Sequence, residues 1–423
     1  MTSRSQRTIF GVALGLCWLS AGAEPLIRVA VLAPRPNDFT PDYVAAHAWL
    51  HGGPHGPAAA AVLDGPAGNA YAATIGAPAV TLLSAYYVHP PTAILTLFPL
   101  VPLGYRGAAL AWLAISVGLL GLLSSLLVAA IGGKDTTGRS RLALFALLLL
   151  WPPVLANFQY GQWSIALATT IALGFTAWDR GRHRQGAAWL GAAVALKLTP
   201  IALLPFVALR DRRAMLSLLG TLAAVALLSM TAGQLQAWRN LIDHSAENVA
   251  AWQGYHHNTL SIGGLTARLF VGGAFARPLV AAPTAARLLG LAGTGALAAT
   301  ALWLTVVPAR APTDRWRDGC QFALWNVVVV ATNPIAWAHY AILLLLPMAL
   351  VLRAADRDPL HAPKMRGLCA VALLALSVPS ETLDRLAGPM PVTPGRGLFV
   401  SLHLLGALLV FAAAALGTRA RPV

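Results

Sequence analysis

The sequence predicts an all-α polytopic membrane protein, and three observations carry this prediction. Of the 423 residues, 57% are hydrophobic and 11% are charged, which is far more apolar than a typical soluble domain. Many apolar runs approach the roughly 20 residues that a membrane helix needs. Basic residues gather between these runs, as in the cytoplasmic loops of membrane proteins. The net charge of +15 therefore does not indicate a nucleic-acid partner.

The basic clusters orient the apolar runs. They lie at 4–7, 134–141, 179–184, 210–213, 310–317, 353–366 and 419–421. Because Lys and Arg are enriched on the cytoplasmic side, we place all of these clusters there. Residues 1–32 are expected to form a retained first helix, with a cleaved secretory signal as the alternative.

One integral membrane domain of about 10–12 membrane helices is expected from this spacing. The regular helices are predicted at 108–131, 142–156, 163–178, 214–231, 284–307, 319–332, 337–352, 367–378 and 398–417. Two segments, 33–89 and 232–278, then lie on the non-cytoplasmic side.

Two apolar runs are irregular. The run 91–103 is short and rich in proline, which favours a broken or membrane-surface helix. The run 186–209 has basic flanks at both ends, with Lys197 and Pro200 in its middle. A re-entrant hairpin would put both flanks in the cytoplasm. The alternative is one ordinary helix with Lys197 snorkelling to the interface.

Asp38 is the candidate catalytic base. It lies in the first external segment, directly after an apolar run. A carboxylate that could be desolvated at this position is costly, so its presence there indicates a function. The alternative is a solvated carboxylate in a turn. Asp42, four residues on, is a secondary candidate, or it caps a short helix at 44–50.

Further polar residues interrupt the apolar runs. A cation such as Lys197 near the membrane interior needs an anion, and a lipid-linked phosphate fits this need. Asn157 and Gln162 are suited to sugar hydroxyls or phosphate, or else they join helices by hydrogen bonds. Arg268 and His339 are further candidates for phosphate, with interfacial snorkelling and backbone contacts as their respective alternatives.

The remaining candidates are histidines. His256 and His257 are adjacent, so they point different ways and form no chelating pair. No metal site and no cofactor is expected. The sequence also lacks a Walker A loop and a Rossmann unit for a nucleotide sugar. Any donor should therefore reach the site through the membrane.

Several motifs together resemble glycosyltransferase family 87, the polyprenyl-phosphate-mannose-dependent mannosyltransferases of the GT-C class. They are Asn37-Asp38-Phe39 with Gly52-Gly53, Tyr87-Val88-His89-Pro90-Pro91, Gly161-Gln162, the stretch 191–200 and Asn333-Pro334-Ile335-Ala336-Trp337-Ala338-His339. His89 departs from the pattern, because an aromatic residue is commoner there in the family. Acceptor recognition, to which we also assign Asp42, His256 and His257, is the least defined part.

The resemblance implies a GT-C fold and an inverting transfer from a polyprenyl-phosphate sugar, with Asp38 deprotonating a lipid- or glycan-linked acceptor. It places the protein in a bacterial inner membrane, in contact with membrane lipid and with no nucleic acid. The rival interpretation is a transporter or lipid flippase, since broken helices and intramembrane cations suit either. A structural subunit is a weaker third option.

Overall fold

The computed structural model describes residues 38–51, 65–78, 89–132, 137–231, 235–255, 257–273, 275–307, 315–388 and 391–419. Within these ranges the protein is helical, and its β-structure is a single isolated bridge between Ala276 and Val392. The predicted all-α fold is confirmed. The expected first helix at 1–32, most of the loop between 52 and 88, and His256 lie outside the described residues.

Four helical stretches in the described part are long and apolar enough to cross a membrane: Pro91–Gly132, Arg212–Met230, Pro283–Val306 and Ala338–Ala355. Two bent helix pairs would bring the number to six. The protein is therefore a multi-pass membrane protein, as predicted. The predicted number of about 10–12 membrane helices is larger because it includes apolar helices shorter than the roughly 20 residues of a full span.

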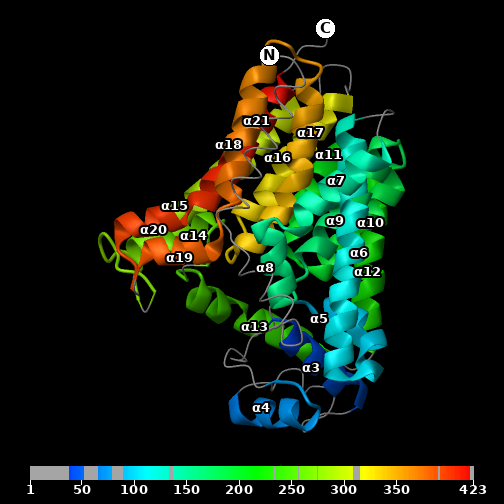
Figure 1. Cartoon of the computed structure of the whole chain (residues 1–423), viewed down its shortest axis with the longest axis vertical. Coiled ribbons are helices and arrows are strands. Elements are labelled where there is room, and N and C mark those ends of the chain that lie inside the picture. Colours follow the sequence, from blue (N-terminus) through cyan, green and yellow to red (C-terminus); the bar gives the residue numbers. More distant parts are fainter. Residues whose placement is uncertain are drawn as a thin grey trace.

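The helices form one elongated bundle with a side arm (Figure 1). The bundle contains α6 (Gly104–Gly132), α7 (Gly138–Leu149), α8 (Pro152–Tyr160), α9 (Ser164–Asp179), α10 (His183–Leu196), α11 (Leu204–Arg210), α12 (Arg212–Thr231), α16 (Arg315–Ala331), α17 (Leu345–Ala355), α18 (Ala362–Leu376) and α21 (Leu402–Thr418). The arm contains α14 (Ile262–Phe270), α15 (Pro283–Val306), α19 (Ser380–Ala387) and α20 (Pro394–Val400). Below the bundle lie α4 (Gly65–Thr74) and α13 (Leu235–Trp252).

Ion pairs join the basic ends of several helices. Asp179 at the end of α9 binds Arg353 and Arg315, each at 3.0 Å. Arg210 binds Asp318 at 2.8 Å. These contacts gather helix ends far apart in the sequence at one end of the bundle, which we call the basic end. Helix α21 also ends at this end of the bundle (Figure 1).

The segment 186–209 is broken where its sequence is polar. Helix α10 ends at Leu196, Lys197 is extended with φ −156° and ψ 133°, and a 3-10 turn, η4 (Thr199–Leu203), leads into α11. The side chains of His183 and Asp211 meet at 3.1 Å, so the chain returns to the end from which it entered. Whether this hairpin is re-entrant in the bilayer stays a prediction.

The segment 91–103 is also irregular. The run 91–103 forms a short helix, α5 (Pro91–Ile94), and a 3-10 helix, η2 (Leu95–Leu103), with two internal prolines. Proline lacks the N–H that a continuous α-helix requires, so the run stays in short turns. Helix α3 (Phe39–His51) packs on η2 and α6.

Aromatic packing fixes the first turn of α3. Phe39 and Tyr43 are fully buried, and their rings contact Tyr105 and Trp112 of α6 at centroid distances of 5.4 to 6.3 Å. Helix α3 begins at Phe39, earlier than the predicted start at 44. Asp42 therefore lies inside the first turn and is not the residue that caps the helix, so the capping interpretation is wrong.

Candidate active site

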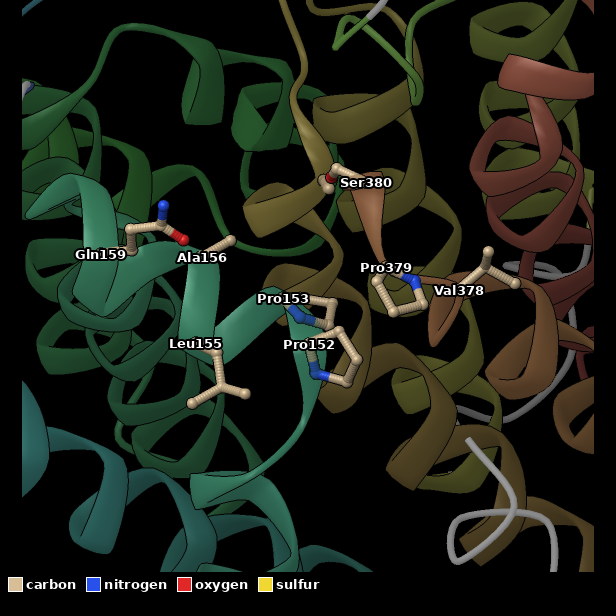
Figure 2. A pocket seen from close by; sticks show the side chains of 9 residues that line it. Pro152, Pro153, Leu155, Ala156, Gln159, Val378, Pro379 and Ser380 are labelled. Carbon is tan, nitrogen blue, oxygen red and sulfur yellow. The ribbon is translucent and has the colours of Figure 1, made fainter. Parts of the chain in front are cut away.

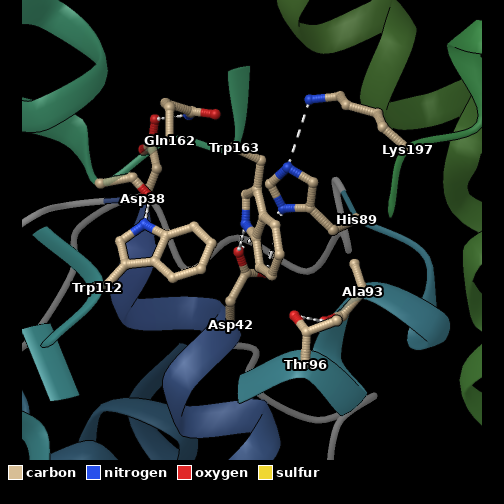
Figure 3. A network of polar contacts seen from close by, with 10 residues as sticks. Asp38, Asp42, His89, Ala93, Thr96, Trp112, Gln162, Trp163 and Lys197 are labelled. Atoms are coloured by element: carbon tan, nitrogen blue, oxygen red, sulfur yellow. Dashed lines mark hydrogen bonds and ion pairs between the residues drawn. The ribbon is translucent and has the colours of Figure 1, made fainter. Parts of the chain in front are cut away.

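Asp38 is held at the junction of two elements. It lies directly before α3, and its backbone N–H donates to the Tyr160 carbonyl at 3.1 Å. Its carboxylate accepts a hydrogen bond from Gln162 Nε2 (Figure 3). The left-handed Gly161, with φ 67°, ends α8 and turns Gln162 toward this carboxylate. Asp38 is thus a half-buried turn residue with two protein partners, Tyr160 and Gln162.

This environment changes the acidity of Asp38. Burial raises its pKa to about 6, against the opposing effects of the Gln162 hydrogen bond and the Lys197 charge. The nearby Asp42 carboxylate also raises it. A carboxylate with this pKa is ionised at neutral pH yet basic enough to take a proton from a hydroxyl as that hydroxyl attacks.

Asp42, one turn further along α3, is held by two donors. His89 Nδ1 lies 3.0 Å from one of its oxygens, and Trp163 Nε1 donates to the same oxygen at 2.8 Å. Both side chains are buried. Figure 3 shows His89 and Trp163 side by side above Asp42.

Lys197 faces the other side of His89. Its Nζ lies 3.4 Å from His89 Nε2 and 4.7 Å from the centre of the Tyr340 ring. The side chain is 8% exposed, so the ammonium is nearly out of solvent. Because α10 ends one residue earlier, the chain can turn this side chain into the protein. Asp38, Asp42 and Lys197 are close enough for their charges to act on one another.

His339 completes this group from a different part of the chain. It lies in a 3-10 helix, η6 (Ala338–Leu344), is 2% exposed, and its Nε2 has no protein partner. Its ring lies 5.0 Å from the Tyr340 ring that faces Lys197. The structure thus brings six of the sequence-predicted residues into one region: Asp38, Asp42, His89, Gln162, Lys197 and His339.

Comparison with known proteins identifies the family. The model of glycosyltransferase family 87 matches residues 87–332, more than half of the chain. The chain belongs to glycosyltransferase family 87. The match begins just before His89 and ends just before Asn333, so it covers Gln162 and Lys197.

Two curated relatives agree with this family. A polyprenol-phosphate-mannose-dependent alpha-(1-2)-phosphatidylinositol mannoside mannosyltransferase of Mycobacterium tuberculosis is 28% identical over 64% of this chain. The protein of the same description from Mycolicibacterium smegmatis is 30% identical over 44% of this chain. The matches span 62% and 41% of these relatives. No solved structure matches the chain significantly.

Aromatic rings line the region between Asp38 and His339 in this family 87 protein. The Trp337 ring lies 6.3 Å from the Tyr160 ring and 6.0 Å from the Tyr255 ring. His257 joins this cluster, with its ring 6.2 Å from that of Trp337. Burial lowers the pKa of His257 to about 4, so it is neutral at physiological pH.

Two predicted donor-binding residues have structural contacts. Arg268 is 1% exposed and donates to the carbonyls of Tyr255 and Asn258 and to the Ser401 hydroxyl. Its guanidinium therefore holds the loop before α14 against α20, and its role in binding phosphate stays a prediction that these contacts do not favour. Asn157 Oδ1 accepts from the Ile165 N–H and fixes the turn between α8 and α9.

Three aromatic residues of the site were missed in the sequence. Trp163 binds Asp42, Tyr340 faces Lys197, and Trp112 donates to the Gly161 carbonyl at 3.0 Å. Trp163 and Tyr340 each follow a candidate residue directly, at Gln162 and His339. Their position next to candidate residues could have indicated a role in the site. Tryptophan and tyrosine are also enriched at membrane–water interfaces, so this position alone did not distinguish the two roles.

A crevice lies between α8 and the segment before α19. Figure 2 shows prolines from both sides facing each other across it. Its lining residues are Pro152, Pro153, Leu155, Ala156, Gln159, Ala338, Val378, Pro379 and Ser380. The walls are mainly apolar, and Ala338 connects the crevice to the neighbouring His339.

Proposed function

We propose that this protein is a membrane glycosyltransferase that moves a hexose from a polyprenyl-phosphate donor to a lipid- or glycan-linked hydroxyl. The observation that supports it is the half-buried Asp38 carboxylate, whose pKa is raised, close enough to the nearly buried Lys197 ammonium for their charges to interact, in a family 87 chain. Mannose is the proposed sugar, because both curated relatives are described as polyprenol-phosphate-mannose-dependent.

Asp38 acts as the general base. The acceptor hydroxyl attacks C1 of the sugar, its proton passes to the Asp38 carboxylate, and the bond from C1 to the phosphate oxygen breaks. The electron pair of that bond stays on the phosphate, so the leaving group is polyprenyl phosphate. Attack from the face opposite the phosphate inverts the configuration at C1. Gln162 keeps the carboxylate in place during the transfer.

Lys197 stabilises the phosphate as it leaves. The phosphodiester carries one negative charge and gains a second as the bond to C1 breaks, so a nearby cation favours the transition state more than the bound donor. The ammonium group is nearly buried, which strengthens its interaction with an anion. The unpartnered His339 Nε2 is available as a further ligand of the phosphate.

The active site lies on the non-cytoplasmic side in this proposal. The ion-paired basic end corresponds to the predicted cytoplasmic flanks. Helices α3 and α5, which carry and support the site, lie toward the opposite end of the molecule (Figure 1). A bacterial inner membrane fits this orientation, with the donor's lipid tail in the bilayer and its phosphate at the site.

A transporter or flippase was the rival interpretation. Membership of a glycosyltransferase family argues against it. A flippase would carry the same lipid phosphate without breaking the bond to the sugar. The two interpretations therefore differ in whether a new glycosidic bond forms.

The test is replacement of Asp38 by Asn in purified protein, with transfer measured from a radiolabelled polyprenyl-phosphate mannose. Loss of a general base lowers the rate by about 10²–10⁴-fold, while donor binding persists. The matched control is Asp243→Asn on the exposed face of α13, which should leave the rate unchanged. An Asp38→Asn protein with the wild-type rate would remove Asp38 as the base.

The folding stability of this variant gives a second readout. The pKa of Asp38 is higher in the folded protein than its ordinary value of 3.8, so above pH 4 the ionised group disfavours the folded state. Replacement by a neutral amide removes this effect. The melting temperature of Asp38→Asn in detergent should therefore equal or exceed that of the wild type, which separates lost catalysis from misfolding.

A further inference from the structure

His89 occupies a position between an acid and a cation. Its Nδ1 lies 3.0 Å from an Asp42 carboxylate oxygen, and its Nε2 lies 3.4 Å from Lys197 Nζ. The imidazole is 3% exposed, so its contacts are with the protein. Figure 3 shows the chain of contacts from Asp42 through His89 to Lys197.

The chemistry of the two neighbours fixes the hydrogen on His89. An ammonium group only donates, so the nitrogen that it approaches must offer a lone pair. That nitrogen is Nε2, and the ring hydrogen is therefore on Nδ1, where it donates to Asp42. Burial lowers the pKa of His89, which agrees with a neutral ring.

The surrounding elements hold this arrangement in place. Trp163 Nε1 donates to Asp42, so the carboxylate keeps its orientation toward His89. The Thr92 hydroxyl, three residues after His89, donates to the Ala195 carbonyl near the end of α10. The start of α5 is thereby tied to the break that carries Lys197.

We propose that His89 is a positioning residue, which links the Asp42 carboxylate to Lys197 and directs the ammonium group toward the phosphate of the lipid donor. This inference rests on the proposed function. It reassigns Asp42 and His89 from the acceptor side to the phosphate side of the site. Asp42 compensates the buried charge of Lys197 through the imidazole, while the two other N–H donors of Lys197 stay available for an anion.

Asp42→Asn has a specific expected effect. The amide oxygen can still accept from Trp163 and from His89 Nδ1, because both approach the same Asp42 oxygen. The amide carries no charge, however, so the hydrogen bond that fixes the hydrogen of His89 on Nδ1 becomes weaker, and with it the hold of His89 on the Lys197 ammonium. We expect the affinity for a lipid phosphate to fall about tenfold, the size expected from losing a hydrogen bond to a charged group.

The experiment measures binding of farnesyl phosphate to the purified full chain, with farnesol as the probe without phosphate. The variants are Asp42→Asn, His89→Phe and the double variant. Both single variants should weaken farnesyl phosphate binding about tenfold and leave farnesol binding unchanged. Because one chain of contacts is broken in each, the double variant should bind no more weakly than His89→Phe.

A matched histidine control is available on α3. His47 hydrogen-bonds to the Tyr71 hydroxyl at 2.9 Å and has no contact with Lys197. His47→Phe should therefore keep wild-type affinity. Melting temperatures of all variants report whether any loss arises from unfolding.

The outcomes separate the two proposals. Wild-type affinity in His89→Phe and Asp42→Asn, or additive losses in the double variant, would overturn the positioning role while leaving the glycosyltransferase proposal intact. A wild-type protein that discriminates no better for farnesyl phosphate than for farnesol would overturn both.

Discussion

The two ends of the bundle use charged side chains in opposite ways. At the basic end, acids bind basic side chains directly: Asp179 to Arg315 and Arg353, Asp318 to Arg210, and Asp211 to His183. At the site, the carboxylates accept from the neutral donors Gln162, Trp163 and His89. Lys197 is near both acids yet bonds to neither.

The acidity of two aspartates reflects this difference. The backbone N–H of Ala214 lowers the pKa of Asp211, with His183 adding to the effect. Burial raises the pKa of Asp38 to about 6. Hydrogen bonds to the ionised carboxylate keep Asp211 acidic, whereas burial keeps Asp38 basic enough to accept a proton. The comparison teaches that the basic end supports the fold and that the site end gives up stability for chemistry.

Removal of Lys197 should have the largest effect after that of Asp38. Lys197→Met is expected to lower kcat/KM for the donor by about 10²–10³-fold, because the developing phosphate charge loses its stabilising group. Steady-state assays with varied donor measure this. The control is Lys364→Met at the start of α18, an exposed lysine whose loss should change nothing. Equal effects in both variants would contradict a special role for Lys197.

Breaking the ion pairs at the basic end should affect stability and not catalysis. Asp179→Asn leaves the guanidinium of Arg353, a mostly buried side chain, without its anion. The free energy of unfolding should fall by about 3 kcal/mol, while the turnover of folded protein stays unchanged. Asp356→Asn, which breaks the exposed pair with Arg366, should change it by less than about 1 kcal/mol. A reduced turnover of folded Asp179→Asn protein would contradict the claim that the basic end supports only the fold.

The pH dependence of transfer tests the state of Asp38. A general base works only when ionised, so kcat/KM should fall about tenfold per pH unit below about 6 and level off above it. A profile that stays flat down to pH 4 would mean that no group with this pKa controls the step.

The smallest expected effect is a shift of this profile. The Gln162 hydrogen bond lowers the pKa of Asp38, so Gln162→Leu should move the acidic limb upward by about one pH unit. The control is Gln159→Leu in α8, because Gln159 lines the crevice. This variant should leave the acidic limb of the pH profile in place. A limb that moved downward would reverse the assigned direction of the Gln162 effect.

Much of the fold was predictable because its signals are local. The apolar runs predicted the bundle, and the prolines predicted the breaks at 91–103 and after Leu196. The bounds differed where packing decided them, as for α3, which begins at Phe39 because its aromatic residues pack on η2 and α6. The helix that begins the chain stays a prediction.

The site was predicted in part. Asp38, Gln162, Lys197 and His339 are unusual in their apolar surroundings, which made them visible in the sequence. Arg268 was equally unusual, but its contacts are with loop carbonyls and a hydroxyl. An isolated cation in an apolar sequence indicates only that a partner is needed. It does not indicate whether that partner is a ligand or the protein's own backbone.

The sequence by itself determined that this chain crosses a membrane repeatedly, which end of each helix is basic, and which few polar residues need an explanation. Only the tertiary structure decided which of these polar residues meet. Asp42, His89, Trp163 and Lys197 come from four separate stretches of the chain. They touch because α3, the start of α5, the turn before α9 and the break after α10 pack together. Hydropathy and charge patterns act over neighbouring residues, whereas a hydrogen bond between distant residues depends on how the helices pack.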